Sequence, residues 1–234
     1  MIESLHHLAL SASACAEYEL LLGRRAVGGT IRTDNVGIAF VDGVRGLASM
    51  TFAVADLDKA ASLLARRAVA ATREGNALAV DGNGVAIRLG ASTHDAPSPL
   101  SVEEAASVSA LDHLVVRSPN PERAIAFYAG RLGLDLRLDR SNPDWGQRLL
   151  FFRCGDLVVE IAHDLKKGVS DAPDQLWGLS WRVPDVAKAN ARLKEAGLDV
   201  DPPRDGRRPG SQVFTVKSGT AGVPTLVIGG VGRW

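Results

Sequence analysis

The stretch LDHLVV at residues 111–116 repeats, with changes, the stretch LHHLAL at residues 5–10. A second pair follows in the same order, AVADLDKA at residues 53–60 and RVPDVAKA at residues 182–189. The offsets are 106 residues (111 − 5) and 129 residues (182 − 53), so the second half carries 23 more residues between these landmarks. Duplication of this kind predicts a chain built from two similar halves.

A low-pattern segment separates the two halves. Residues 91–110 read ASTHDAPSPLSVEEAASVSA, which is rich in Ala, Ser and Pro and has little apolar periodicity. Such composition between two patterned regions is typical of a linker. We therefore expect an N-terminal domain over residues 1–91, a linker over residues 92–110 and a C-terminal domain over residues 111–234.

Each half contains the same short unit twice, and the unit over residues 111–162 shows it best. An apolar run over residues 111–117 reads as a strand, Asn120 and Pro121 then begin a helix, and Gly133 ends it. Strand patterns follow at residues 134–138, 149–154 and 157–162. The pattern recurs after residue 179, with Asp185 as the helix cap, and in compressed form before residue 90. The sequence thus predicts an α+β fold of four strand–helix–strand–strand–strand (βαβββ) modules.

Composition excludes several classes of protein. The 234 residues carry 27 Lys+Arg and 27 Asp+Glu, so the net charge is zero, and no basic stripe suggests nucleic acid as a partner. The two cysteines, Cys15 and Cys154, lack CxxC spacing and read as reduced thiols of a cytoplasmic protein. We see no signal peptide, no apolar stretch near ~20 residues and no nucleotide-binding loop, and so expect neither a membrane span nor a nucleotide cofactor.

These stretches, with PERAIAFYAGRLGL at residues 121–134 and LSWRVPDV at residues 179–186, resemble the vicinal oxygen chelate superfamily. That superfamily includes glyoxalase I, bleomycin-resistance proteins, extradiol ring-cleaving dioxygenases and methylmalonyl-CoA epimerase. The resemblance covers nearly all of residues 110–229 and, more weakly, residues 2–90. It implies two curved β-sheet cups with helices on the outside. It also implies a divalent metal on the inner face of a cup, held by His and Glu ligands.

The implied metal site is half complete in this chain. The first-strand ligand falls on His113 and the last-strand ligand of the same module falls on Glu160. The two counterparts in the fourth module fall on Gly178 and Leu226, which have no coordinating side chain. The resemblance therefore implies His113 and Glu160 as both metal ligands and catalytic residues, for Zn, Fe, Mn or Ni, in an incomplete set. The N-terminal half offers only His7, so we expect that cup to be structural.

Other side chains are candidates for the wall of a substrate site. Strand alternation points Ser180 and Arg182 to the same side as the expected ligands. Trp145 lies in the polar loop SNPDWG at residues 141–146, and Trp177 precedes the strand of the fourth module. Leu226 lies on the last strand. We take these five residues as candidate substrate contacts.

Three functions stay open. The first is a metal-dependent lyase, isomerase or dioxygenase acting on a small oxygen-bearing organic molecule. An extradiol dioxygenase is disfavoured, because its ligand triad would need His113, Gly178 and Leu226. The second is a metal-free binding protein of the sequestering, bleomycin-resistance type, and the third is a metal-free catalyst that uses Glu160 and His113 as base and acid. The expected partner is a small molecule, and exposed sheet edges leave a homodimer open.

Overall fold

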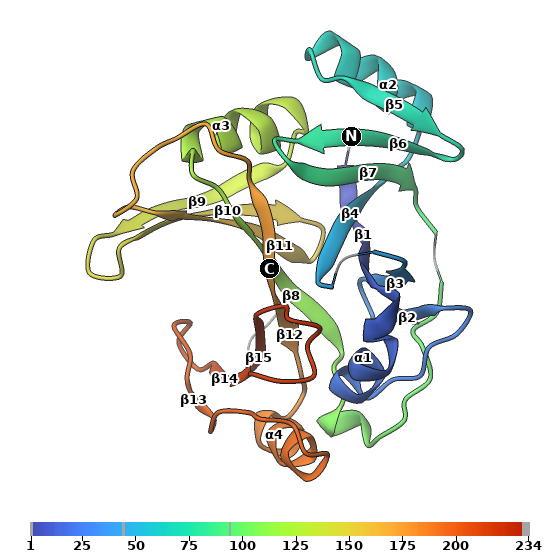
Figure 1. Cartoon of the computed structure of the whole chain (residues 1–234), viewed down its shortest axis with the longest axis vertical. Coiled ribbons are helices and arrows are strands. Elements are labelled where there is room, and N and C mark those ends of the chain that lie inside the picture. Colours follow the sequence, from blue (N-terminus) through green and yellow to red (C-terminus); the bar gives the residue numbers. More distant parts are fainter. Residues whose placement is uncertain (1, 44, 94, 231–234) are drawn as a thin grey trace.

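Two curved β-sheets form the framework of the computed structural model, which describes residues 2–43, 45–93 and 95–230 (Figure 1). The N-terminal sheet has the strand order β2-β3-β1-β4-β7-β6-β5. The C-terminal sheet has the order β13-β14-β15-β12-β8-β11-β10-β9. The helices lie on the outside of the sheets.

The N-terminal sheet is built from two modules of unequal length. The first module comprises β1 (Ile2–Ser11), η1 (Ala12–Ala14), α1 (Cys15–Leu22), β2 (Thr30–Arg32) and β3 (Gly37–Val41). The second comprises β4 (Leu47–Val54), α2 (Leu57–Arg66), β5 (Ala71–Glu74), β6 (Ala77–Gly82) and β7 (Val85–Ala91). The first module thus has two strands after its helix in the described residues, one fewer than the pattern predicts. A short helix, η2 (Glu104–Ala106), lies in the segment between the sheets.

The C-terminal sheet is built from two complete modules. The third module comprises β8 (Ala110–Arg117), α3 (Pro121–Ile125), the π-helical η3 (Ala126–Arg131), β9 (Asp135–Asn142), β10 (Gln147–Cys154) and β11 (Leu157–Asp164). The fourth comprises β12 (Gln175–Arg182), α4 (Val186–Glu195), β13 (Arg204–Asp205), β14 (Gln212–Val216) and β15 (Thr225–Gly229). The first strands, β8 and β12, pair antiparallel, and each also pairs in parallel with the last strand of its own module. The predicted α+β fold of tandem modules is confirmed.

Side-chain caps begin three of the helices, and two of these caps, Asn120 and Asp185, are where the sequence predicts them. The carboxylate of Asp56 accepts hydrogen bonds from the backbone N–H groups of the first turn of α2. Asn120 caps α3 in the same way, with Pro121 next to it, and Asp185 caps α4. Each cap satisfies N–H groups that have no partner within the helix, which is why the chain changes from strand to helix at these positions.

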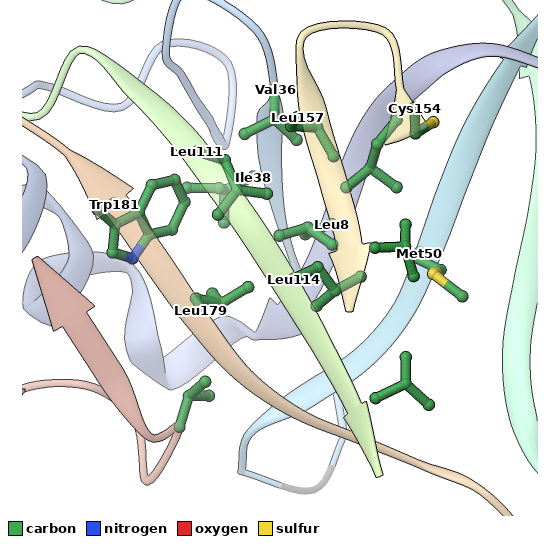
Figure 2. Packing of buried hydrophobic residues seen from close by; sticks show 14 of the residues in the cluster. Leu8, Val36, Ile38, Met50, Leu111, Leu114, Cys154, Leu157, Leu179 and Trp181 are labelled. Atoms are coloured by element: carbon green, nitrogen blue, oxygen red, sulfur yellow. The ribbon is translucent and has the colours of Figure 1, made fainter. Parts of the chain in front are cut away.

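One apolar cluster joins the two sheets, as Figure 2 shows. Leu8 and Ile38 from the N-terminal sheet pack in it with Leu114 and Leu179 from the C-terminal sheet. Alternation along β8 assigns its two faces, because Leu114 and Val116 are fully buried in this cluster. The opposite face of the C-terminal sheet, which carries His113, Glu160, Ser180 and Leu226, is called the inner face below.

No helix among the described residues combines the length and the apolar character needed to cross a membrane.

Candidate functional site

Strand register brings the predicted site residues together on the inner face. His113 on β8 is paired with Ser180 on β12, and Ser180 is paired with Leu226 on β15. Glu160 on β11 is paired with Val115, two residues along β8 from His113. Because paired residues project to the same face of a sheet, the two modules supply one site from four adjacent strands.

His113 and Glu160 form the polar centre of this face. His113 Nε2 lies 3.7 Å from Glu160 Oε2 and 2.8 Å from the Ser180 hydroxyl. The two side chains are only 16% and 14% exposed. Burial raises the pKa of Glu160, an effect partly offset by the nearby charges of His113 and Arg207. The separation of 3.7 Å exceeds a hydrogen bond, so a substrate atom can be placed within reach of both groups.

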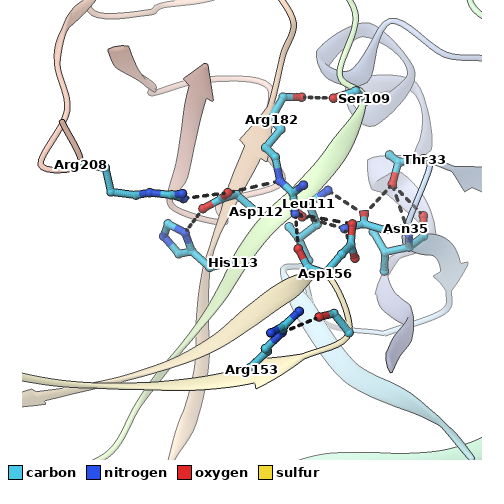
Figure 3. Close-up of polar contacts among 12 residues, drawn as sticks. Thr33, Asn35, Ser109, Leu111, Asp112, His113, Arg153, Asp156, Arg182 and Arg208 are labelled. Carbon is cyan, nitrogen blue, oxygen red and sulfur yellow. Dashed lines mark hydrogen bonds and ion pairs between the residues drawn. The ribbon is translucent and has the colours of Figure 1, made fainter. Parts of the chain in front are cut away.

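A bulge in β8 gives His113 a carboxylate partner on its other nitrogen. Between the pairs His113–Ser180 and Leu111–Trp181, β8 advances two residues while β12 advances one, so Asp112 is the extra residue. The fully buried Asp112 Oδ2 lies 2.9 Å from His113 Nδ1 (Figure 3). An ionised carboxylate only accepts, so Nδ1 carries the hydrogen of this bond. In the neutral ring, Nε2 is then the acceptor and faces Ser180 and Glu160.

Arg182 holds Asp112 in place from the end of β12. Its Nε lies 3.2 Å from Asp112 Oδ1, and Arg208 reaches the same oxygen at 3.6 Å. Arg182 also donates to the backbone carbonyls of Leu111 (3.0 Å) and Asp156 (2.6 Å). Alternation pointed Arg182 toward substrate, whereas the described structure places it, 8% exposed, among these groups of the protein itself.

The same network reaches into the N-terminal half of the chain. The side chain of Asn35 donates to the carbonyl of Leu111 at 2.8 Å and to the carboxylate of Asp156 at 3.1 Å, and it accepts from the Leu111 N–H at 2.9 Å (Figure 3). The loop before β3 is therefore bonded to the start of β8. This contact fixes the strand that carries Asp112 and His113.

Both tryptophans proposed as wall residues carry an arginine on their rings. Trp145, 41% exposed in the turn between β9 and β10, lies 3.9 Å from the guanidinium carbon of Arg207. Trp177 is the extra residue of a second bulge, in β12, and Arg117 stacks on it at 4.0 Å. Leu226 is partly buried on the inner face beside Ser180.

The residues present do not complete a four-ligand metal centre. His113 and Glu160 are one imidazole and one carboxylate, and their counterparts Gly178 and Leu226 supply nothing. A Cβ at Gly178 would lie 2.9 Å from the backbone oxygen of Pro224, so this position is closed to a larger side chain. Within the described ranges, no group of three or more His, Cys, Asp and Glu residues is placed to hold an ion.

The N-terminal counterpart, His7, lies in a different setting. Burial, assisted by the charges of His6 and Arg32, lowers the pKa of His7 to about 4. Its ring packs so closely on Gly37 that a Cβ there would lie 2.5 Å from it. No carboxylate on a paired strand faces His7 as Glu160 faces His113, within the residues that the structure describes.

The comparisons with known proteins agree with the fold. Residues 112–215 match the model of the Glyoxalase/Bleomycin resistance protein/Dioxygenase superfamily. An ethylmalonyl-CoA/methylmalonyl-CoA epimerase of Cereibacter sphaeroides is 28% identical over 100 residues, which are 40% of this chain and 75% of the relative.

Two solved dioxygenases match the whole chain. BphC, a halotolerant catechol dioxygenase, has a TM-score of 0.76 at 14% identity, over 100% of this chain and 89% of its own. The 2,2',3-trihydroxybiphenyl 1,2-dioxygenase of Sphingomonas wittichii has a TM-score of 0.73 at 16% identity, over 100% and 92%. At these identities the structural likeness concerns the fold.

Proposed function

Because the chain belongs to the vicinal oxygen chelate superfamily, we propose that its C-terminal inner face binds a small oxygen-bearing organic molecule and transfers a proton at one of its carbons. Glu160 is the base and His113 is its acidic partner. The observation that carries this proposal is the arrangement of Asp112, His113 and Glu160. A buried carboxylate faces an imidazole whose other nitrogen is fixed by a second carboxylate.

The reaction that fits this geometry removes a proton from a carbon next to a carbonyl group. The C–H bond breaks, the proton goes to Glu160 Oε2, and the electron pair moves onto the carbonyl oxygen to form an enolate. A hydrogen bond from the Ser180 hydroxyl stabilises that oxygen, or one from His113 Nε2–H where the ring carries a hydrogen on both nitrogens; the hydroxyl and Nε2 lie 2.8 Å apart. Return of a proton to a different carbon gives the isomer, and delivery to the opposite face of the same carbon, by a second acid or after the enolate turns, gives the epimer. Burial favours this role, because it raises the pKa of Glu160 toward the pH at which a base works best.

The sequence relative supports the same chemistry. That relative is an ethylmalonyl-CoA/methylmalonyl-CoA epimerase, and an epimerase inverts a centre by moving a proton off and back onto a carbon. The inner face of this chain offers one well-placed base for such a step. We therefore favour a carbonyl compound with an acidic C–H bond as the substrate class.

A divalent ion held by His113 and Glu160 is the second candidate. The bond from His113 Nδ1 to Asp112 favours it, because metal-bound histidines usually donate their other nitrogen to a carboxylate. The absence of donors at Gly178 and Leu226 weighs against it. Two protein ligands leave most of the shell of Zn, Fe, Mn or Ni to water or substrate.

Deuterium exchange tests the proposal. Chelator-treated protein is incubated in D2O with a panel of acyl-CoA thioesters and 2-oxo acids, and loss of the C–H signal is followed by NMR. We expect exchange with at least one compound and a loss of about 100-fold or more in Glu160→Gln, the usual contribution of a general base. Asp164→Asn is the matched control, because Asp164 lies four residues along the same strand and its carboxylate accepts a hydrogen bond from the Lys166 N–H, away from the proposed base.

Three results would contradict metal-free proton transfer. Deuterium exchange at the wild-type rate in Glu160→Gln would show that Glu160 is not the base. Exchange that stops on chelation and returns with one added ion would favour the metal-dependent candidate. Compounds that bind, quench tryptophan fluorescence and are recovered without deuterium across the whole panel would favour the sequestering protein.

A further inference from the structure

Three arginines surround the inner face beside the proton-transfer pair. Resting on the proposed function, we propose that Arg117, Arg140 and Arg207 form an anion-binding subsite, so that the substrate carries a carboxylate or phosphate group.

Strand register places two of these arginines at the ends of one cross-strand row. Arg140 on β9 pairs with Leu149 on β10, Leu149 with Ala162 on β11, and Ala162 with Arg117 on β8. All four side chains project to the inner face, since each is in register with the next. Three strand spacings separate the ends, so the two Cα atoms are about 14 Å apart. Between them lie two apolar residues, the buried Leu149 and the partly exposed Ala162, which form an apolar floor.

The third arginine comes from the opposite edge of the sheet. Arg207 lies in the loop between β13 and β14, and β13 and β9 are the two edge strands. Its guanidinium nevertheless lies over Trp145, in the turn between β9 and β10, which is also 5.4 Å from Arg140. The two loops therefore meet across the inner face, and Trp145 brings two of the three positive charges together.

Within the described residues, these three charges make no close ion pair with a carboxylate, although Arg207 lies near enough to Glu160 to counter part of the effect of burial on its pKa. Among the described residues, Arg117, Arg140 and Arg207 have ring contacts but no ion pair within 4.0 Å. By contrast, Arg148 on the other face of β10 is paired with both Asp139 and Glu122. A guanidinium stacked on an indole ring keeps its N–H edge available, and that edge matches carboxylate and phosphate oxygens in pairs. An anion that lies over the apolar floor would supply the counter-charge to these three arginines.

The row also sets a distance within the substrate. Ala162 lies two residues beyond Glu160 on β11, which is about 7 Å along the strand. The anionic group is therefore expected about 7 Å, or a few bonds, from the carbon that gives up its proton. This spacing selects a carbonyl compound with a separate anionic substituent.

Matched ligands test the subsite without any need for turnover. Calorimetric titrations use benzoate and phenyl phosphate as anions and benzamide as the neutral analogue. We expect one or both anions to bind about tenfold or more tightly than benzamide, since bonds to charged groups are the stronger ones. The preferred anion distinguishes a carboxylate from a phosphate substrate. Salt at about 1 M should weaken anion binding, because exposed charges are then screened.

Single variants locate the effect. Arg117→Gln and Arg207→Gln should each weaken anion binding about tenfold and leave benzamide unchanged. Arg153→Gln is the control, because Arg153 lies on the same face of β10 but at its far end, bonded to the carbonyl of Gly155. Equal binding of anions and benzamide, or wild-type binding in both arginine variants, would overturn the subsite.

The two proposals can fail separately. Glu160→Gln should keep its anion binding, because the subsite lies beside that carboxylate and does not include it. Anion binding without deuterium exchange would remove the proton-transfer proposal and keep the subsite. Deuterium exchange with neutral compounds alone would remove the anion-binding subsite and keep the proton-transfer proposal.

Discussion

Replacement of Asp112 by asparagine separates stability from chemistry in the network beneath the site. Asp112 is fully buried and its carboxylate lies 3.2 Å from Arg182, 3.6 Å from Arg208 and 2.9 Å from the ring of His113. Asparagine keeps the shape and removes the charge. Arg182 is then left in the interior without its nearest counter-ion.

The expected cost follows from these distances. A unit-charge pair at 3.2 Å has a gross attraction of about 5 kcal/mol at an effective dielectric constant of 20, before desolvation is subtracted. Loss of one partner of a buried pair costs about 3–5 kcal/mol. Arg182 keeps two backbone carbonyls and a carboxylate of Asp156 at 3.7 Å, which favours the lower end. We expect about 3 kcal/mol, or a decrease in Tm of about 6–12 °C at roughly 2–4 °C per kcal/mol.

Urea denaturation followed by circular dichroism measures this loss directly. Asp156→Asn is the control. Its carboxylate is 32% exposed and its contact with Arg182 is longer, so we expect about 1 kcal/mol or less. A stability of Asp112→Asn within about 1 kcal/mol of the wild type would refute the reasoning that this pair holds the site together.

Three further predictions concern the site. Glu160→Gln should stabilise the protein by about 1–3 kcal/mol at pH 8, because burial raises the pKa of Glu160 and the folded state disfavours its charged form. This gain should vanish below the ordinary glutamate pKa of about 4.3, where the carboxyl group is protonated in both states, and thermal melts across pH would show it. The rate of deuterium exchange should increase with pH through that raised pKa, whereas a profile centred on an ordinary glutamate pKa would count against the base. Gly178→Ala should cost about 1–3 kcal/mol in urea denaturation, because its Cβ would lie 2.9 Å from the Pro224 carbonyl oxygen, and a neutral effect would reopen this position to a ligand.

The general plan of the chain could be predicted from its sequence. The duplicated stretches predict four modules, and the cap residues Asn120 and Asp185 predict where two helices begin. Strand alternation assigns His113 and Glu160 to one face, where register brings them within 3.7 Å. These features depend on local patterns that repeat every two or every three to four residues, which is why they can be read from the sequence.

The missed residues depend on irregular backbone. Alternation would point Asp112 away from its neighbour His113, and only the bulge in β8 brings the two side chains together. The sequence predicts Trp177 as a wall residue, but its position as the extra residue of a bulge in β12 could not be predicted from alternation. Arg207 lies in a loop, and no sequence pattern predicts the path of that loop over the sheet. Arg182 contacts the carboxylate of Asp112, which strand alternation would place on the opposite face from Arg182 and His113.

The central claim is that Glu160 accepts a proton from the substrate. It is tested most directly by the rate of deuterium incorporation from D2O into one turned-over carbonyl compound, measured with chelator-treated wild type, Glu160→Gln and Asp164→Asn. The proposal predicts a rate about 100-fold or more lower in Glu160→Gln and nearly unchanged in Asp164→Asn. Equal rates in the wild type and Glu160→Gln would contradict it.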